Sequence, residues 1–412
     1  MDLKTTCYTA DIPSVKGGLF MLDTIVFVLL LAVKVFAVYF AVIALFALKK
    51  PRSFAQHAPQ IRFACVIAAR NEEAVITEMV ESLHRQNYPD AFYDIYVVPN
   101  NCTDHTEERA RAAGAKIFRC FEPIRSKGDV LNEVFRWLIK KDYAAFCVFD
   151  ADNIVEENFL SRMNDAMCSG ARVCKGAMKA KNPYDSALAG CYGLYFTFFD
   201  IFYSRARMNC GLSSKLVGTG FAVHREALEA LGGWHTETIA EDAEFSVQCA
   251  VKGLRVYFVP EALTYDESPN SFLVSLHQRR RWCSGIMDVA QKNEKCLLQG
   301  LRQRHWRRVF DSFMIINSPF SQVFSFVPLL LSSILLFDRS GAAALGMNIL
   351  MSAALGYLGC TALATLLVFL GGYRDKRILR TILFYPVFMA SFLPLQVISM
   401  IRRTQIWRPI SH

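Results

Sequence analysis

The fold class is decided by the stretch Asp142-Tyr-Ala-Ala-Phe-Cys-Val-Phe-Asp-Ala-Asp152, in which an apolar run ends at two carboxylates. The run from Asp142 to Phe149 is short and continuously apolar, which predicts a buried strand. Similar runs alternate with helical patterns, so strands are expected at 61–69, 93–99 and 116–119 and helices at 72–86, 107–113 and 129–140. This alternation predicts an α/β domain with a parallel sheet covered on both faces.

Polar clusters stand at three of the predicted strand ends: Arg70-Asn-Glu-Glu73, Asn100-Asn-Cys-Thr-Asp104 and Asp150-Ala-Asp152. Ligands bind at the carboxyl ends of strands in such sheets. The carboxylates of Asp150 and Asp152 suit one hard divalent cation, because Mg²⁺ takes one or two carboxylates plus substrate phosphates. The alternative is an Asp cap of a helix that follows near Glu156, and this motif alone leaves both interpretations open.

The composition combines a soluble domain with membrane segments. The 412 residues include 46 Lys and Arg and 37 Asp and Glu, a net charge of +9, and 53% are apolar, which excludes a disordered chain or a nucleic-acid-binding tail. From Val309 to Gly371 only three residues are charged, so this region is predicted to enter a membrane. The surplus positive charge lies in 271–308 and 372–412, beside apolar runs, as expected near anionic lipid.

The first apolar run, 19–48, is longer than the roughly 7–15 apolar residues of a signal peptide and predicts an uncleaved transmembrane anchor. Lys49-Lys-Pro-Arg52 follows, so the positive-inside rule places the next residues in the cytoplasm. Thirteen Cys scattered in apolar runs also fit a reducing cytosol. A multi-pass protein of the plasma membrane is therefore expected.

The predicted organisation has eight parts: an extracytoplasmic N-terminus (1–18), the anchor (19–48), a cytosolic domain (53–270), basic interfacial helices (271–308), spans at 318–337 and 342–369, an apolar segment (378–401) and a cytosolic tail (402–412). The segment 378–401 contains Pro386 and Pro394 and has basic residues on both flanks. An interfacial or re-entrant segment is favoured over a span, because it keeps both basic flanks inside.

Two further motifs carry chemistry. Glu241-Asp242 precedes a helical pattern and offers a general base for an acceptor hydroxyl, although acidic residues also favour helix starts for electrostatic reasons. Gln278-Arg-Arg-Arg-Trp282 offers Arg for a diphosphate and a flat Trp face for a sugar ring, although a basic juxtamembrane helix would need no ligand.

In this order, D-x-D at 150–152, Glu241-Asp242 and Gln278-x-x-Arg-Trp282 resemble the membrane-embedded family 2 glycosyltransferases. These are the inverting synthases of cellulose, chitin, hyaluronan and poly-N-acetylglucosamine, and the layout looks most like the rhizobial chitin-oligosaccharide and hyaluronan synthases. The resemblance implies a GT-A (Rossmann-like) cytosolic domain with an N-terminal transmembrane anchor and C-terminal transmembrane or interfacial helices.

For the donor, the resemblance implies a UDP-sugar site. Arg70 and Glu72 belong to the first-strand motif that lines a uracil pocket. Asn100 and Asp104 would lie around the nucleoside, although such families often have Asp where this chain has Asn100. Lys127 and Asp150 are expected near the nucleotide, and Gln278 and Arg281 on the diphosphate.

For catalysis, the resemblance implies Asp242, beside Glu241, as the base and Asp152 with Asp150 as ligands of Mg²⁺ or Mn²⁺. Gly218 and Gly220 would form a small-residue loop beside the acceptor, and Trp282 would hold the acceptor's terminal ring.

The expected activity is inverting β-transfer from UDP-N-acetylglucosamine or UDP-glucose, elongating a polysaccharide processively. Non-processive transfer to a lipid acceptor is the alternative, and a membrane scaffold with an inactive transferase domain is a second. The expected partners are the UDP-sugar, a saccharide or lipid-linked acceptor and membrane lipids, with no nucleic acid. Three firm spans are few for a polymer channel, which would need interfacial helices or a homo-oligomer.

Overall fold

The computed structural model describes residues 13–404, so most of the predicted N-terminus (1–18) and tail (402–412) lie outside the described residues. Within this range one sheet holds eight strands: β1 (Phe63–Ala69), β2 (Tyr93–Pro99), β3 (Lys116–Ile117), β4 (Ala145–Asp150), β5 (Ile154–Val155), β6 (Val173–Ala180), β7 (Phe221–His224) and β8 (Val256–Asp266).

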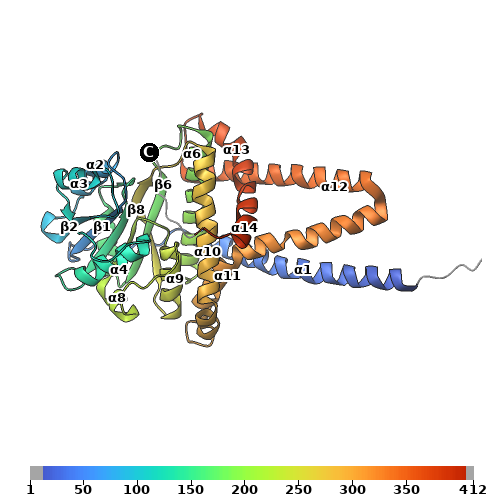
Figure 1. The fold of residues 1–412 in the computed structure, drawn as a ribbon, viewed down its shortest axis with the longest axis horizontal. Coiled ribbons are helices and arrows are strands. Elements are labelled where there is room, and N and C mark those ends of the chain that lie inside the picture. Colours follow the sequence, from blue (N-terminus) through green and yellow to red (C-terminus); the bar gives the residue numbers. More distant parts are fainter. Residues whose placement is uncertain (1–12, 405–412) are drawn as a thin grey trace, which may run out of the picture.

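The helical segments of the sheet domain surround these strands (Figure 1). They are η2 (Asp90–Phe92), α2 (Ile76–His84), α3 (Thr106–Ala112), α4 (Lys127–Leu138), α5 (Phe159–Cys168), α6 (Ala187–Phe198), the π-helical η3 (Phe199–Arg205), α7 (Ala206–Asn209), α8 (Arg225–Leu231), α9 (Glu241–Val251) and α10 (Phe272–Gly300).

The strand order is β3-β2-β1-β4-β7-β6-β8-β5. The neighbours β3, β2, β1 and β4 are parallel, as the sequence predicts. The predicted parallel arrangement does not extend over the whole sheet, because β7 runs antiparallel to both β4 and β6. The Gly220 N–H donates to Val148 O at 2.9 Å, so β7 begins where β4 ends and runs backwards along it.

Each face of the sheet has its own hydrophobic core. From β1, Phe63, Cys65 and Ile67 pack on the side of α2 and α5. Ala64, Val66 and Ala68 pack on the opposite side, against residues of α4 and α8. All seven residues of β1 are buried, which is why the strand reads as a continuous apolar run rather than an alternating one.

Long apolar helices extend away from the sheet domain in one direction (Figure 1). They are α1 (Pro13–Leu45), followed by η1 (Phe46–Leu48), and then α11 (Trp306–Phe324) and α12 (Phe326–Gly371). The chain reverses within α12 at Gly341, whose φ of +80° breaks the helix into two arms. In the part that the structure describes, three segments are long and apolar enough to cross a membrane: Met21–Leu48, Trp306–Gly371 and Ile378–Ile401.

The last of these segments is broken into α13 (Ile378–Ala390) and α14 (Phe392–Ile401). Helix α13 packs against α6, and α14 packs against α10 of the sheet domain. Figure 1 shows α14 lying across the direction of α1 and α12. The segment thus packs against helices of the sheet domain, and whether it spans a membrane or lies at its surface stays a prediction.

A buried ion pair joins the sheet domain to the long apolar helices. The Arg207 Nε, on α7, lies 3.0 Å from the Asp311 Oδ2 on α11, and both side chains are 1% exposed. The Tyr39 hydroxyl, on α1, donates to the same carboxylate at 2.8 Å. Three elements distant in sequence therefore meet at one carboxylate.

Candidate active site

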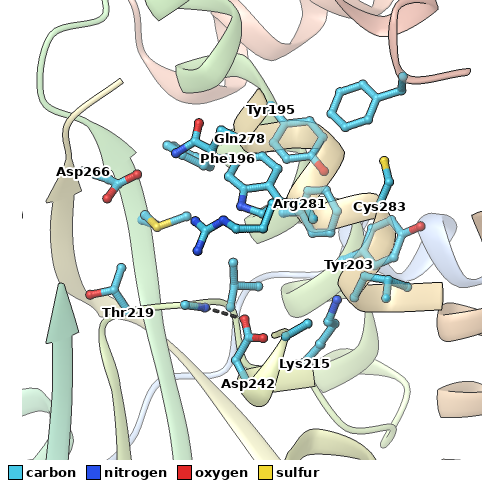
Figure 2. Close-up of a pocket in the computed structure, with 18 of the residues that line it drawn as sticks. Tyr195, Phe196, Tyr203, Lys215, Thr219, Asp242, Asp266, Gln278, Arg281 and Cys283 are labelled. Carbon is cyan, nitrogen blue, oxygen red and sulfur yellow. Dashed lines mark hydrogen bonds between the residues drawn. The ribbon is translucent and has the colours of Figure 1, made fainter. Parts of the chain in front are cut away.

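A cavity of about 650 Å³ lies between the carboxyl end of β4 and the helices α9, α10, α11 and α14. Ten of the fourteen predicted site residues line it: Glu72, Lys127, Asp150, Asp152, Gly218, Glu241, Asp242, Gln278, Arg281 and Trp282. Figure 2 shows Arg281, Asp242 and Asp266 directed toward the same space from different elements. The structure therefore brings together the three motifs that the sequence places far apart.

Asp150 ends β4 and Asp152 follows it, and a third carboxylate, Asp266, lies beside them at the end of β8. The Asn153 amide donates to Asp266 Oδ1 at 2.7 Å and to Asp152 Oδ1 at 3.2 Å. Burial, together with the nearby Asp266 and Asp150, raises the pKa of Asp152 well above its ordinary value. These crowded carboxylate oxygens are suitable ligands for a hard divalent cation.

No group of three His, Cys, Asp or Glu side chains within residues 13–404 is arranged to hold an ion without help. Such a site suits Mg²⁺ or Mn²⁺, because one or two carboxylates are usually completed by water and substrate phosphates. The assignment of Asp150 and Asp152 as metal ligands stays a prediction, in which the donor would supply further ligands.

Lys127 holds the acidic motifs together. The Ser126–Asp129 capping box fixes the start of α4 and places Lys127 in its first turn. The Lys127 ammonium donates to Asp150 Oδ1 and, at 2.6 Å, to Gly218 O. Burial alone would lower the pKa of Lys127, but the carboxylates of Asp150 and Glu241 outweigh it and raise the pKa. The lysine predicted near the nucleotide thus also positions the acidic groups.

Glu241 and Asp242 open α9, where the helix dipole favours negative charge. The Gly218 N–H donates to Asp242 Oδ2 at 2.5 Å, which fixes the carboxylate at the cavity wall (Figure 2). Glu241 is buried, and burial, with Asp242 adding to the effect, raises its pKa to about 7. The two neighbours differ in surroundings, and the more accessible Asp242 faces the cavity.

The loop Gly218-Thr-Gly220 supports both acidic motifs. The Asp150 N–H donates to Thr219 Oγ1 at 3.0 Å, and both glycines have positive φ, +39° and +61°. A Cβ on Gly220 would lie 2.8 Å from Thr264 Oγ1, so the position excludes a side chain. Gly218 lines the cavity, whereas Gly220 lies behind it.

Gln278, Arg281 and Trp282 share one face of α10 because they are three and four residues apart. The Tyr195 ring stacks on Trp282, with centroids 6.1 Å apart and planes 11° apart. The Gln278 Oε1 is buried and has no hydrogen-bond partner within the described residues, which is uncommon for a buried polar atom. Gly285, one turn further along α10, lies against α9: a Cβ there would be 2.8 Å from the Ala240 Cβ.

Arg70, Asn100 and Asp104 do not line this cavity. Asp104 accepts from the Glu73 N–H at 3.1 Å, and Thr106 Oγ1 accepts from the Glu72 N–H at 2.8 Å. The second-strand motif therefore supports the loop that carries Glu72. The Asn100 amide is buried, and neither of its polar atoms has a partner in the described part of the chain.

The sequence analysis missed four charged residues of the cavity wall: Asp266, Lys175, Asp200 and Lys215. Asp266 follows a strand, the signal that identified Asp150. Lys175 stands among other basic residues in the sequence, and burial lowers its pKa to about 8. Burial raises the pKa of Asp200 to about 7, with Lys175 opposing the shift. No sequence signal distinguishes Lys215.

The family described as "Glycosyltransferase like family 2" matches residues 59–285. The probable glycosyltransferase YdaM of Bacillus subtilis is 28% identical over 264 residues, 61% of each protein. The β-monoglucosyldiacylglycerol synthase of Synechocystis is 28% identical over 238 residues, 55% of this chain and 48% of that protein. The putative cellulose synthase 2 of Komagataeibacter xylinus is 22% identical over 244 residues, 57% of this chain and 16% of that protein.

The matched regions thus span from about one-sixth to about three-fifths of these relatives. Among solved structures, the mannosyltransferase PcManGT of Pyrobaculum calidifontis, in complex with GDP-Man and Mn²⁺, has a TM-score of 0.63 at 16% identity. The similarity covers 91% of this chain and 99% of that one, which shows a shared fold. Because the family match covers more than half of the 412 residues, the chain belongs to the glycosyltransferase family 2-like proteins and is a glycosyltransferase of the GT-A fold.

Proposed function

We propose that the protein transfers a hexose from a UDP-sugar, UDP-glucose or UDP-N-acetylglucosamine, to a hydroxyl of a membrane-borne acceptor, with inversion to a β-linkage. The observation that supports this most is one cavity lined by Asp152, Asp242 and Arg281, three residues of different motifs. A metal-ligand set, a base and a diphosphate-binding cation in one place are what an inverting displacement requires.

On the donor side, Arg281 would bind the diphosphate, and the unpartnered Gln278 Oε1 would accept from a donor hydroxyl. The buried, unpaired amide of Asn100 is suited to a nucleobase edge. Asp150 and Asp152 would hold Mg²⁺ or Mn²⁺, which when bound offsets charge on the departing UDP. The Mn²⁺ complex of PcManGT agrees with a divalent requirement.

On the acceptor side, Asp242 would take the proton of the attacking hydroxyl. The Gly218 N–H and the start of α9 hold this carboxylate in place, so it needs no rearrangement before the reaction. The attack displaces UDP from the opposite face of the sugar in one step, which gives inversion without a covalent intermediate.

A lipid is the acceptor that we favour. Only 6% of the most apolar window of Met21–Leu48 and 11% of that of Trp306–Gly371 are buried within the chain. Surfaces exposed to this extent suit multi-pass anchoring in a lipid bilayer, with residues 53–270 at the cytoplasmic side of the plasma membrane. The lipid-glycosylating relative from Synechocystis supports the same acceptor class.

Processive polysaccharide elongation is a second candidate. The stacked pair Tyr195–Trp282 offers an aromatic platform for a sugar ring, and the cellulose synthase match is consistent with it. The length of the product distinguishes the two candidates.

The test is a panel of UDP-sugars on the purified full chain with Mg²⁺ or Mn²⁺, with UDP release and product mass as readouts. Asp242→Asn should lower UDP release about 10²–10⁴-fold, the usual effect of losing a general base. Glu229→Gln, at an exposed carboxylate of α8, is the control and should behave as wild type. An Asp242→Asn rate within tenfold of wild type would show that the base is assigned wrongly.

A further inference from the structure

The reaction cavity has a second half that the sugar chemistry does not use. Beyond Asp242 and Trp282, its wall passes onto the membrane helices, with Ser318, Pro319 and Gln322 of α11 and Leu393 and Gln396 of α14. These helices belong to segments apolar enough to cross a membrane. One cavity therefore connects the catalytic carboxylates with the level of the bilayer.

The two halves of the cavity differ in charge. The charged lining residues belong to the sheet domain and α10, whereas those contributed by α11, α12, α13 and α14 are uncharged: Ile315, Ser318, Pro319, Gln322, Ser325, Phe326, Met389, Phe392, Leu393 and Gln396. An ionised headgroup would lose its hydration here without gaining a counter-ion. The wall thus favours an uncharged occupant.

The uncharged half contains one buried polar group that lacks a partner. Gln396 is 6% exposed, and its Nε2 donates to the Gln322 Oε1 at 2.6 Å. The Gln396 Oε1 has no partner within the described residues, although leaving a buried acceptor unpaired is destabilising. A hydroxyl O–H is the donor that this atom would accept from without charge.

The lining of the cavity at this place includes residues that are exposed on the surface of the chain. Pro319 lies inside α11 and has no N–H to donate to Ile315 O, and the Ser318 hydroxyl donates to that carbonyl at 2.8 Å instead. Gln322 and Phe326 are exposed at the outer side of the chain, whereas Gln396 is buried behind them. The cavity lining between α11 and α14 therefore extends from the exposed Gln322 and Phe326 to the buried amide of Gln396.

We infer that the acceptor is an uncharged lipid alcohol that reaches the site sideways from the bilayer, between α11 and α14, past the Gln322–Gln396 amide pair. The inference rests on the proposed sugar transfer and adds the acceptor's class and route. The acceptor O–H donates to Gln396 Oε1 as the lipid enters and then turns to Asp242, which takes its proton. The acceptor oxygen bonds to the anomeric carbon, and the bond from that carbon to the diphosphate breaks, its electron pair leaving with UDP.

The test uses the full chain in phosphatidylcholine vesicles that contain equal mole fractions of diacylglycerol, which is uncharged, and phosphatidylglycerol, which is anionic and also carries hydroxyls. Glycolipid is measured by mass spectrometry and total UDP release by a coupled assay. Diacylglycerol should be the preferred acceptor. Two outcomes would overturn the inference while leaving the sugar transfer intact. One is a preference for phosphatidylglycerol, and the other is UDP release with a polymer as the sole product and no glycolipid.

Variants test the route. Ser318→Trp and Gln396→Leu should each lower the ratio of glycolipid to total UDP released by at least about tenfold, since the acceptor is misplaced while the donor site is intact. Leu329→Trp, on the exposed side of α12 and outside the cavity, should keep the wild-type ratio. Equal ratios in all three variants would refute the route. Absence of UDP release from wild type with every donor would instead refute the proposed function.

Discussion

Replacing Asp311 by asparagine should destabilise the chain by about 3–5 kcal/mol, the usual cost of breaking a buried ion pair from one side. Asp311 and Arg207 are each 1% exposed, so water cannot solvate the guanidinium once its counter-charge is removed. Both carboxylate oxygens lie near the Arg207 Nε, at 3.1 Å and 3.0 Å, and the Tyr39 hydroxyl donates to the same group. An asparagine amide offers one acceptor oxygen and would leave the guanidinium buried without a counter-charge.

The assay is thermal unfolding of the purified full chain in lipid nanodiscs. At about 2 °C per kcal/mol, the lower end for large domains, the apparent Tm should fall by about 6–10 °C. Glu237→Gln is the control, because Glu237 is 79% exposed and lies 3.4 Å from Lys292, so its loss should cost at most about 1 kcal/mol.

The double variant Arg207→Met/Asp311→Leu sharpens the test. Apolar residues of similar volume remove both charges, so the apparent Tm should recover most of the loss. A double variant as unstable as the two single variants combined would show that the pair is not coupled. A decrease in apparent Tm of less than about 2 °C for Asp311→Asn would refute the reasoning altogether.

Two further predictions concern the acidic site. Burial raises the pKa of Glu241 to about 7, so the folded chain keeps a proton that the unfolded chain has lost. The free energy of unfolding should therefore fall as pH rises from about 4.5 to about 7, and in Glu241→Gln the apparent Tm should depend less on pH in this window; an unchanged slope would contradict the assignment. Chelation should abolish transfer and added Mg²⁺ or Mn²⁺ should restore it, with Asp152→Asn needing at least about tenfold more metal for half-activity than Asp142→Asn, whose carboxylate is 97% exposed. Activity that persists in excess EDTA would remove the metal from the mechanism.

The part of the site that the sequence predicts is the part that follows local rules. Asp150 ends an apolar strand and Asp242 begins a helix, and parallel strands bring such ends to one edge of a sheet. Gln278 and Arg281 could be placed together because helical spacing puts them on one face. These inferences need no knowledge of how distant segments pack.

The remainder depends on packing between distant segments. The direction of β7 follows from the loop before it, which re-enters the sheet beside Val148, a residue some 70 positions earlier in the chain. The hydrophobic pattern of the sequence does not predict this pairing. Lys175 reads as an ordinary surface lysine, yet it is 3% exposed because β6 lies inside the sheet. Gln396 looks like a lone polar residue in an apolar run until α14 meets α11.

The contact between Gly285 and Ala240 has a consequence for how rate depends on structure. Gln278, Arg281 and Gly285 belong to one continuous helix of 29 residues, about 43 Å long, and Ala240 immediately precedes the base motif. The distance between Arg281, which would bind the leaving group, and Asp242, which would receive the proton, thus depends on how closely α10 approaches Ala240. The absence of a side chain at Gly285 allows this close approach. A larger residue at position 285 would therefore widen that distance without changing the identity of any reacting residue.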